Sequence, residues 1–436
     1  MAKEAGIANI QFIEASFGEI LSDKKIDTEF DFIVLHGVYT WVSREVRKEI
    51  INIIKKLLKP GGIVYISYNT LPGWTPVMPL QRLIMEYAAQ FPHRKSVKNM
   101  VEVLNKIELL EQRGFFKLNE EALKARLGKI KKQKTANIRY LVHEYMHTGW
   151  EPLYFCDVSR DMKEAKLEFI CSCDLAFSFP ALVNVDILQK LYQEEYSVEF
   201  KQLLMDFVFN TAFRKDIFGK GVPKITFSAA ASALLKRKFM LTVPAKEIDT
   251  EFIIVPAGKL KPEAWFESLI KFIEQGPKPL NEIMQNLNIN LYSTEFRALV
   301  RTLALLISQE KVATVSELPD REVQERARRL NMILKKIDDV FMVANILYLV
   351  SPFARTGVEF PVLHRQIAWE ILGGRGASAE ELVPYICNFV KQRKIRLEKE
   401  DNTPVQENEL GNFVHEKCRD ILENNLPIWK NLGIIV

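Results

Sequence analysis

The stretch Phe30-Asp-Phe-Ile-Val-Leu35 is the first of two short apolar runs that decide the fold, and Ile63-Val-Tyr-Ile-Ser67 is the second. Between them lies an amphipathic stretch from Arg44 to Leu58, which a Pro-Gly-Gly break closes. A strand, a helix, a break and a second strand form a βαβ unit of about the expected length. Ligands of open α/β sheets bind beyond the carboxyl ends of the strands. The site is therefore expected in the two aromatic turns that follow these strands, His36–Trp41 and Tyr68–Trp74.

Length and composition set limits on the class of protein. The 436 residues are enough for roughly three domains. A net charge of +5 on so long a chain is too weak to indicate nucleic acid as a partner. No apolar run approaches the roughly twenty residues of a membrane span, and the amino terminus has no signal-peptide pattern. The cysteines are scattered and odd in number, which favours reduced thiols in a cytoplasmic protein: Cys156, Cys171, Cys173, Cys387 and Cys418.

The rest of the chain is mostly helical in pattern. Helices are predicted at Leu80–Gln90, Ser96–Arg113 and Asn119–Lys134. Three closely spaced helices between residues 263 and 309, followed by a short strand at Val312–Val315, suggest a winged-helix-like module. Its third helix, Thr294–Gln309, is mostly apolar and carries only two arginines, Arg297 and Arg301. A helix that reads DNA needs more polar and basic side chains, so we expect this helix to pack or to contact protein.

One motif matches a zinc-protease pattern. In His143-Glu-Tyr-Met-His147, two histidines four residues apart could lie on one face of a helix, with a glutamate placed to activate water. A catalytic zinc also needs a third ligand and a helix that continues past the second histidine, but Thr148-Gly149 breaks the pattern at once. We therefore predict no metal site. The sequence also lacks a glycine-rich loop after a strand and a nucleophile elbow.

The two aromatic turns remain as the candidate site. Aromatic residues near strand ends are usually buried in the core, and that alternative stays open. Polar and aromatic residues alternate in both turns, however, and Gly37, Pro72 and Gly73 shape their backbone. Because turns at the ends of neighbouring strands converge on one crevice, we predict a ligand or substrate pocket there.

These residues resemble a class I S-adenosylmethionine-dependent methyltransferase, which has a Rossmann-like core. In that family the turn after the third strand contacts the adenine of the cofactor, and the resemblance assigns this role to Ala15, Ser16 and Phe17. The turn after the fourth strand faces the methionine part and the methyl acceptor, and the resemblance transfers this to His36, Gly37, Val38, Tyr39 and Trp41.

A closer resemblance is to methyltransferases with a regulatory domain, in particular the rickettsial protein-lysine methyltransferases that modify outer membrane protein B. The segments that carry it occur in the order His36–Val42, Tyr68–Trp74, Tyr140–Tyr145, Trp150–Phe155 and Ala212–Phe218. The resemblance implies S-adenosylmethionine as the cofactor and lysines of an outer-membrane protein as the substrate.

The family's glycine-rich first motif, and the acidic residue that ends its second strand, are not found in this sequence. The resemblance therefore implies a core whose first two strands are absent, with Met1 near the end of the helix after the second strand. The family's strand order, 3-2-1-4-5-7-6, would separate a strand at Ile10–Ile13 from the strand at Phe32–Leu35 and leave the latter with an open edge. We expect a separately encoded amino-terminal half as a partner, and the open edge also allows a homodimer.

The expected fold class is an incomplete Rossmann-like α/β core followed by mostly α structure. The expected domains are a partial methyltransferase core (1–75), a helical insertion (76–137), a methyltransferase regulatory domain (138–220), a β-containing connector (221–258), a winged-helix-like domain (259–350) and a C-terminal helical region (351–436).

The expected function is that of the carboxyl-terminal portion of a protein-lysine N-methyltransferase, weak or inactive alone. The candidate pocket wall is Tyr39, Trp41, Tyr68 and Trp74, and Asn69 is the candidate acceptor that orients the lysine amine. Two alternatives remain. One is a non-catalytic regulatory or interaction protein, and the other is nucleic-acid binding through the winged-helix-like module.

Overall fold

The computed structural model describes residues 2–435 apart from 23–25, 27, 114–123, 125, 132–137, 176–194, 256–257, 316, 318, 342–345, 400 and 402. The helix predicted at Asn119–Lys134 lies mostly outside the described residues. The chain divides into two compact units, Glu14–Lys224 and Met1–Ile13 with Ile225–Val436.

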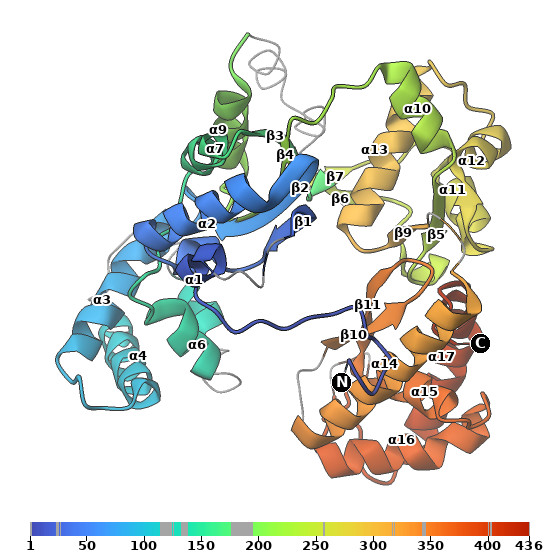
Figure 1. Cartoon of the computed structure of the whole chain (residues 1–436). Coiled ribbons are helices and arrows are strands. Elements are labelled where there is room, and N and C mark those ends of the chain that lie inside the picture. The colour runs from blue at the N-terminus through green and yellow to red at the C-terminus, as the bar shows by residue number, and fades with distance from the viewer. Residues whose placement is uncertain are drawn as a thin grey trace. The chain divides into compact units, whose positions relative to one another are not determined.

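A four-stranded sheet organises the unit Glu14–Lys224 (Figure 1). Its strands, in spatial order, are β1 (Phe30–Leu35), β2 (Leu58–Asn69), β4 (Phe213–Lys220) and β3 (Leu167–Ser172). β1 and β2 are parallel, whereas β4 runs antiparallel to both of its neighbours. The methyltransferase resemblance implies the strand order 3-2-1-4-5-7-6. The observed order β1-β2-β4-β3 corresponds to the last four strands of that order, 4-5-7-6.

The predicted βαβ unit is confirmed. Helix α2 (Arg44–Leu57) joins β1 to β2, and the Ser43 hydroxyl caps its first turn. The apolar face of α2 places Ile50 and Ile54 in a core with residues of β2. The Pro-Gly-Gly segment expected as a break lies inside β2. Strand β2 pairs with β1 both before this segment, at Leu58, and after it, at Ile63, and the register shifts between the two.

Helices cover one face of this sheet, which we call the first face. Helix α7 (Phe155–Glu164) packs there beside α2, and α1 (Phe17–Ser22) packs against α2. Helix α9 (Val198–Phe209) lies beside α7. On β2, Val64, Ile66 and Tyr68 point to this face and are completely buried.

The opposite face, which we call the second face, carries exposed apolar side chains. Phe32 and Val34 of β1 are 68% and 65% exposed, and Phe213 of β4 is 45% exposed. A sheet with parallel strands ordinarily buries both faces. Within the described part of the chain, β1 also has no strand on its outer edge.

The strand predicted at Ile10–Ile13 is wrong. These residues form no strand, and Phe12 is 82% exposed. Among the described residues, no neighbouring strand supplies the hydrogen-bond partners that an extended segment needs.

A group of helices packs beyond the carboxyl ends of β1 and β2. They are the short η2 (Thr75–Val77), α3 (Met78–Ala89), α4 (Ser96–Gln112) and α6 (Ile138–Tyr145). The apolar faces of these helices share a second core, to which Trp74 and Trp150 belong.

The other unit contains a three-stranded sheet with β5 (Lys238–Leu241) between β8 (Lys278–Pro279) and β9 (Val312–Val315). Three helices and a strand were predicted here, and they are confirmed as α11 (Phe266–Glu274), α12 (Leu280–Asn286), α13 (Thr294–Ser308) and β9. Strand β5 comes from the segment expected to be a connector, so that segment and the following module share one sheet. The winged-helix assignment stays a prediction.

The remaining elements of this unit are mostly helices around a hairpin. They are α10 (Phe227–Leu235), η5 (Ala245–Glu247), the small hairpin β6 (Ile253–Val255) and β7 (Gly258–Leu260), α14 (Arg321–Phe341), the hairpin β10 (Ile346–Ser351) and β11 (Thr356–Pro361), α15 (Val362–Leu372), α16 (Ala379–Arg393) and α17 (Leu410–Asn431). In neither unit is a described helix both long and apolar enough to cross a membrane.

Candidate functional site

The turn after β1 lies at the carboxyl end of the sheet. Gly37 has a φ of +65°, a left-handed conformation that favours glycine, and its amide donates a 2.8 Å hydrogen bond to Oγ of Ser67 on β2. His36 is exposed, and its Nδ1 lies 2.9 Å from the hydroxyl oxygen of Tyr65. Val38 is half-buried and packs against the first-face core. These contacts tie β1 to β2 and leave the His36 ring open to solvent.

Tyr39 and Trp41 belong to the next short helix, η1 (Tyr39–Trp41), but they contact different parts of the unit. Tyr39 is completely buried in the first-face core, and its hydroxyl donates a 2.7 Å hydrogen bond to Oδ2 of Asp161 on α7. Burial, followed by the Asp161 carboxylate, raises the pKa of Tyr39 far above its usual value, so the side chain stays a neutral phenol.

Trp41 packs instead against aromatic side chains near the end of α6. Its ring stacks on His143 with centroids 4.8 Å apart, and it meets the edge of His147 at 5.6 Å. Helix α6 ends at Tyr145, so His147 lies beyond the helix. The two histidines of the zinc-like motif therefore both contact Trp41 rather than projecting together from one continuous helix.

Trp74 of the second turn belongs to the same aromatic cluster. Its ring centroid lies 5.0 Å from that of Trp150, and Cζ of Arg126 lies 4.4 Å from the Trp74 ring. Trp150 in turn lies 6.4 Å from Trp41. The structure thus brings together Trp41 and Trp74, one from each predicted turn. It adds Trp150 between them, a residue that the sequence singled out only as part of a family motif.

Tyr68 lies elsewhere, in a buried network of charges on the first face. Its hydroxyl donates a 2.7 Å hydrogen bond to Asp216 on β4. Arg214 binds the same carboxylate at 2.8 Å and Asp206 of α9 at 2.8 Å, and it also binds Gln202. Burial raises the pKa of Asp206 to about 6 although Arg214 opposes this shift.

Asn69, the predicted orienting residue, ends β2 with its side chain on the same face as Ser67. It is buried, and its Nδ2 has no hydrogen-bond partner among the described residues. Its backbone carbonyl accepts a bond of 3.1 Å from the amide of Leu153.

Ala15, Ser16 and Phe17 lead into α1. The Ser16 hydroxyl accepts from the Glu19 amide at 3.3 Å, and the Glu19 carboxylate accepts from the Ser16 amide at 2.7 Å. This reciprocal pair is a capping box, and it accounts for Ser16 without a cofactor. Phe17 packs against the first-face core. A cofactor role for these three residues stays a prediction.

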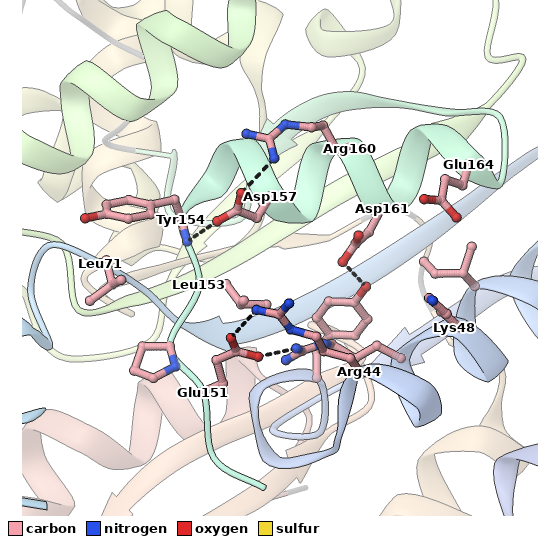
Figure 2. A pocket seen from close by; sticks show the side chains of 14 residues that line it. Arg44, Lys48, Leu71, Glu151, Leu153, Tyr154, Asp157, Arg160, Asp161 and Glu164 are labelled. Atoms are coloured by element: carbon pink, nitrogen blue, oxygen red, sulfur yellow. Dashed lines mark hydrogen bonds and ion pairs between the residues drawn. The ribbon is translucent and has the colours of Figure 1, made fainter. Parts of the chain in front are cut away.

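A pocket of about 430 Å³ lies between α2 and α7, and we call it the α2–α7 pocket (Figure 2). Tyr39 from the first turn and Leu71 from the second both line it. Its other lining residues are Arg44, Arg47, Lys48, Ile51, Glu151, Pro152, Leu153, Tyr154, Asp157, Arg160, Asp161 and Glu164. The part of the chain that the structure describes holds no cluster of side chains suited to a metal ion.

Sequence reasoning missed the acidic side of this pocket and the buried Arg214 network. Asp157, Asp161 and Glu164 recur at helical spacing, which could have indicated one charged helix face. Arg214 and Asp216 alternate with Phe213 and Lys215, and this period-two pattern could have indicated a strand with inward charges.

Parts or all of this chain are similar to known proteins. Residues 137–220 match the family model described as a predicted methyltransferase regulatory domain. An uncharacterized protein of Synechocystis sp. is 28% identical, over 100% of this chain and 83% of that protein. An uncharacterized protein of Rickettsia prowazekii is 26% identical, over 56% of this chain and 44% of that protein.

The fold matches that of a solved protein. The structure of PKMT2 from Rickettsia typhi in complex with AdoHcy has a TM-score of 0.64 and 18% sequence identity, covering 98% of this chain and 85% of that one. A second structure of the same protein gives a TM-score of 0.63 with equal coverage. The chain therefore has the fold of this protein and contains a segment similar to a methyltransferase regulatory domain.

Proposed function

We propose that this chain forms the methyl-acceptor side of an S-adenosylmethionine-dependent protein-lysine methyltransferase. The observation that carries the proposal is the parallel β1–β2 pair, whose two aromatic turns meet at its carboxyl end in a sheet of order β1-β2-β4-β3. The regulatory-domain match and the fold of a protein solved with AdoHcy support the same class of enzyme.

The residues present fit one side of such a cofactor site. Gly37 and the exposed His36 lie where the first turn opens to solvent, next to the edge of β1 that has no partner strand among the described residues. When bound, the cofactor would supply a methyl group on a positively charged sulfonium. Because no glycine-rich turn follows a strand in this sequence, we propose that a further segment holds the rest of the cofactor.

A lysine amine attacks only when it is neutral, although the pKa of a free lysine is near 10.4. An aromatic, water-poor setting lowers that pKa, because burial disfavours the charged form. Trp41, Trp74 and Trp150 form such a setting at the strand ends. Trp41, the half-buried member of this cluster, would also stabilise a cationic sulfonium or a methylated ammonium. Asn69 is our candidate for orienting the amine.

The second face of the sheet supports a further part of the proposal. Phe32 and Val34 expose apolar surface beside the free edge of β1, which is unusual for a sheet with parallel strands. We propose that a segment carrying the glycine-rich turn covers this face and pairs with β1. The solved relative is longer than this chain, which covers 85% of it. Without such a segment, the chain is expected to be weak or inactive.

The proposed substrate is a lysine-bearing outer-membrane protein, in keeping with the rickettsial resemblance. The test is methyl transfer from radiolabelled S-adenosylmethionine to such a protein, with the chain alone and with a co-expressed fragment that carries a glycine-rich strand-turn-helix. Activity should appear only with the fragment, and Trp41→Ala should reduce it. Full activity without the fragment would refute the two-part site, and no activity with a stably bound fragment would refute the enzyme.

A second candidate function is a non-catalytic interaction protein of the same fold. It is favoured by the complete burial of Tyr39 and Tyr68, whose hydroxyls are both engaged inside the protein. In that case Trp41→Ala would leave the binding of a protein partner unchanged. Neither the chain alone nor the chain with the co-expressed fragment would transfer methyl groups.

A further inference from the structure

The α2–α7 pocket is distinct from the crevice proposed for methyl transfer, because it lies on the first face between two helices (Figure 2). Its charged lining is balanced. Arg44, Arg47, Lys48 and Arg160 are basic, whereas Glu151, Asp157, Asp161 and Glu164 are acidic. Ile51, Leu71, Leu153 and Tyr154 add apolar surface. A neutral but strongly charged lining suits a zwitterionic ligand better than a simple anion or cation.

One part of the pocket is rich in hydrogen-bond donors. Arg44 and Arg47 both bind the single carboxylate of Glu151, Arg44 at 2.9 Å, which leaves one positive charge in excess. Arg47 is only 5% exposed, and its Nη1 is buried with no hydrogen-bond partner among the described residues. A buried donor without a partner is costly, and a guanidinium is suited to carboxylates. Together with the exposed guanidinium of Arg44, Arg47 makes this part of the pocket suited to an acceptor such as a carboxylate.

The other part is acidic. Asp157, Asp161 and Glu164 lie on one face of α7, and Figure 2 shows the side chain of Asp161 turned toward the tyrosine hydroxyl that it binds. Asp157 is paired with Arg160 at 2.9 Å. Burial raises the pKa of Asp161 although the Tyr39 hydroxyl and Arg47 oppose this, and repulsion from the carboxylates of Glu164 and Asp157 adds to the rise. An ammonium group placed here would relieve that repulsion.

Tyr39 links the two parts. Its ring centroid lies 5.9 Å from Cζ of Arg47, and its hydroxyl lies 2.7 Å from Asp161. A ligand that reaches both Arg47 and Asp161 must carry a carboxylate and an ammonium, joined by an aliphatic chain that can lie on Ile51 and Leu153. A lysine has these groups in this order.

We infer that the α2–α7 pocket binds a lysine-type ligand, with the carboxylate at Arg44 and Arg47 and the ε-ammonium at Asp161 and Glu164. The same chemistry comes from free lysine or from a lysine beside an acidic residue in a peptide. Only the second source rests on the proposed function, because it makes the pocket a docking site for a protein substrate. In either case the ligand contacts the turn that carries Tyr39.

The test is calorimetry on the full chain without any cofactor, so its outcome does not depend on methyl transfer. The probes are L-lysine, L-norleucine (which lacks the ε-ammonium), lysinamide (which lacks the carboxylate) and a short peptide in which glutamate precedes lysine. Lysine or the peptide should bind, and norleucine should bind at least about tenfold more weakly, as expected for the loss of a charge-assisted hydrogen bond. Binding of the peptide alone assigns the pocket to a substrate, and binding of free lysine assigns it to an amino-acid effector.

Variants locate the site. Asp161→Asn keeps an acceptor for the Tyr39 hydroxyl, and Glu164→Gln changes an exposed side chain, so both should fold. Each should weaken lysine or peptide binding by about tenfold, whereas Glu168→Gln, an exposed change outside the pocket, should have no effect. The inference is overturned if neither lysine nor the peptide binds at millimolar concentration, if norleucine or lysinamide binds as well as lysine, or if the two α7 variants bind normally.

Discussion

The hydroxyl of Tyr39 donates a 2.7 Å hydrogen bond to Oδ2 of Asp161, which lies 122 residues later in the chain. Tyr39 follows β1, whereas Asp161 lies in the segment that matches a predicted methyltransferase regulatory domain. That segment also contributes β3 and β4 to the sheet, and its residues His143 and His147 contact Trp41. The turn after β1 is thus held from several sides by the regulatory-type segment, and the two share one sheet.

Tyr39→Phe is expected to destabilise the protein. The change removes the hydrogen bond and leaves the half-buried Asp161 without this donor, which costs about 1–3 kcal/mol. The measurement is the free energy of unfolding in urea. Tyr292→Phe is the matched control, because Tyr292 is 76% exposed and its change should cost less than about 0.5 kcal/mol. Equal stabilities of the two variants would contradict the structural role of the bond.

Asp161→Asn is expected to stabilise the protein at neutral pH. Burial raises the pKa of Asp161 in the folded state, so folding favours the protonated carboxyl. The stability that this preference contributes is fully present below the pKa of the carboxyl in the unfolded chain, about 3.9. It is lost as the pH rises through the pKa of Asp161 in the folded protein. Asparagine does not ionise and still accepts from Tyr39, so the variant should exceed the natural protein in stability at pH 7. The difference should vanish in acid, and a difference that is constant with pH would count against this explanation.

The sequence predicted β1, α2 and β2 because their apolar periodicity and turn chemistry are local. It missed β4 because Phe213–Lys220 carries four charged residues, Arg214, Lys215, Asp216 and Lys220, and two of these are paired inside the protein. The strand predicted at Ile10–Ile13 is wrong for the converse reason: an apolar run forms a strand only when another strand lies beside it.

The candidate site was predictable only in part. The topological rule correctly indicated where the two turns would lie, and Trp41 and Trp74 share one aromatic cluster with Trp150. The rule could not indicate which side chains turn inward. Tyr68, predicted for the pocket wall, lies in the Arg214 network and not in the aromatic cluster. Side-chain direction at strand ends depends on partners such as Asp161 and Asp216, which are distant in the sequence.

Arg214→Met is expected to be severely destabilising. It leaves the completely buried carboxyls of Asp206 and Asp216 without their cation, and breaking a buried pair in this way costs about 3–5 kcal/mol. Lys215→Met, at the exposed neighbouring position, should change stability by less than about 0.5 kcal/mol. Urea unfolding and soluble yield measure both effects.

A combined variant sharpens this prediction. Replacing Arg214, Asp206 and Asp216 together by apolar residues removes all three buried charges of this network, so it should cost less than Arg214→Met alone. If the combined variant is less stable than Arg214→Met, the attraction between the charges of the network exceeds the cost of burying them. The network would then contribute net stability.

The exposed second face of the sheet is expected to cause self-association in the absence of a covering segment. Phe32 and Val34 are 68% and 65% exposed next to the free edge of β1, and such an edge pairs readily with another chain. The combined change Phe32→Ser and Val34→Thr should lower the sedimentation coefficient at high protein concentration toward that of a monomer. Tyr292→Ser removes an equally exposed aromatic ring in the other unit and should leave association unchanged.

The same double variant should fail to bind the fragment that carries the glycine-rich turn, because both kinds of partner would use this face. If the natural protein is monomeric at all concentrations and the double variant still binds the fragment, the second face is not where the proposed covering segment docks.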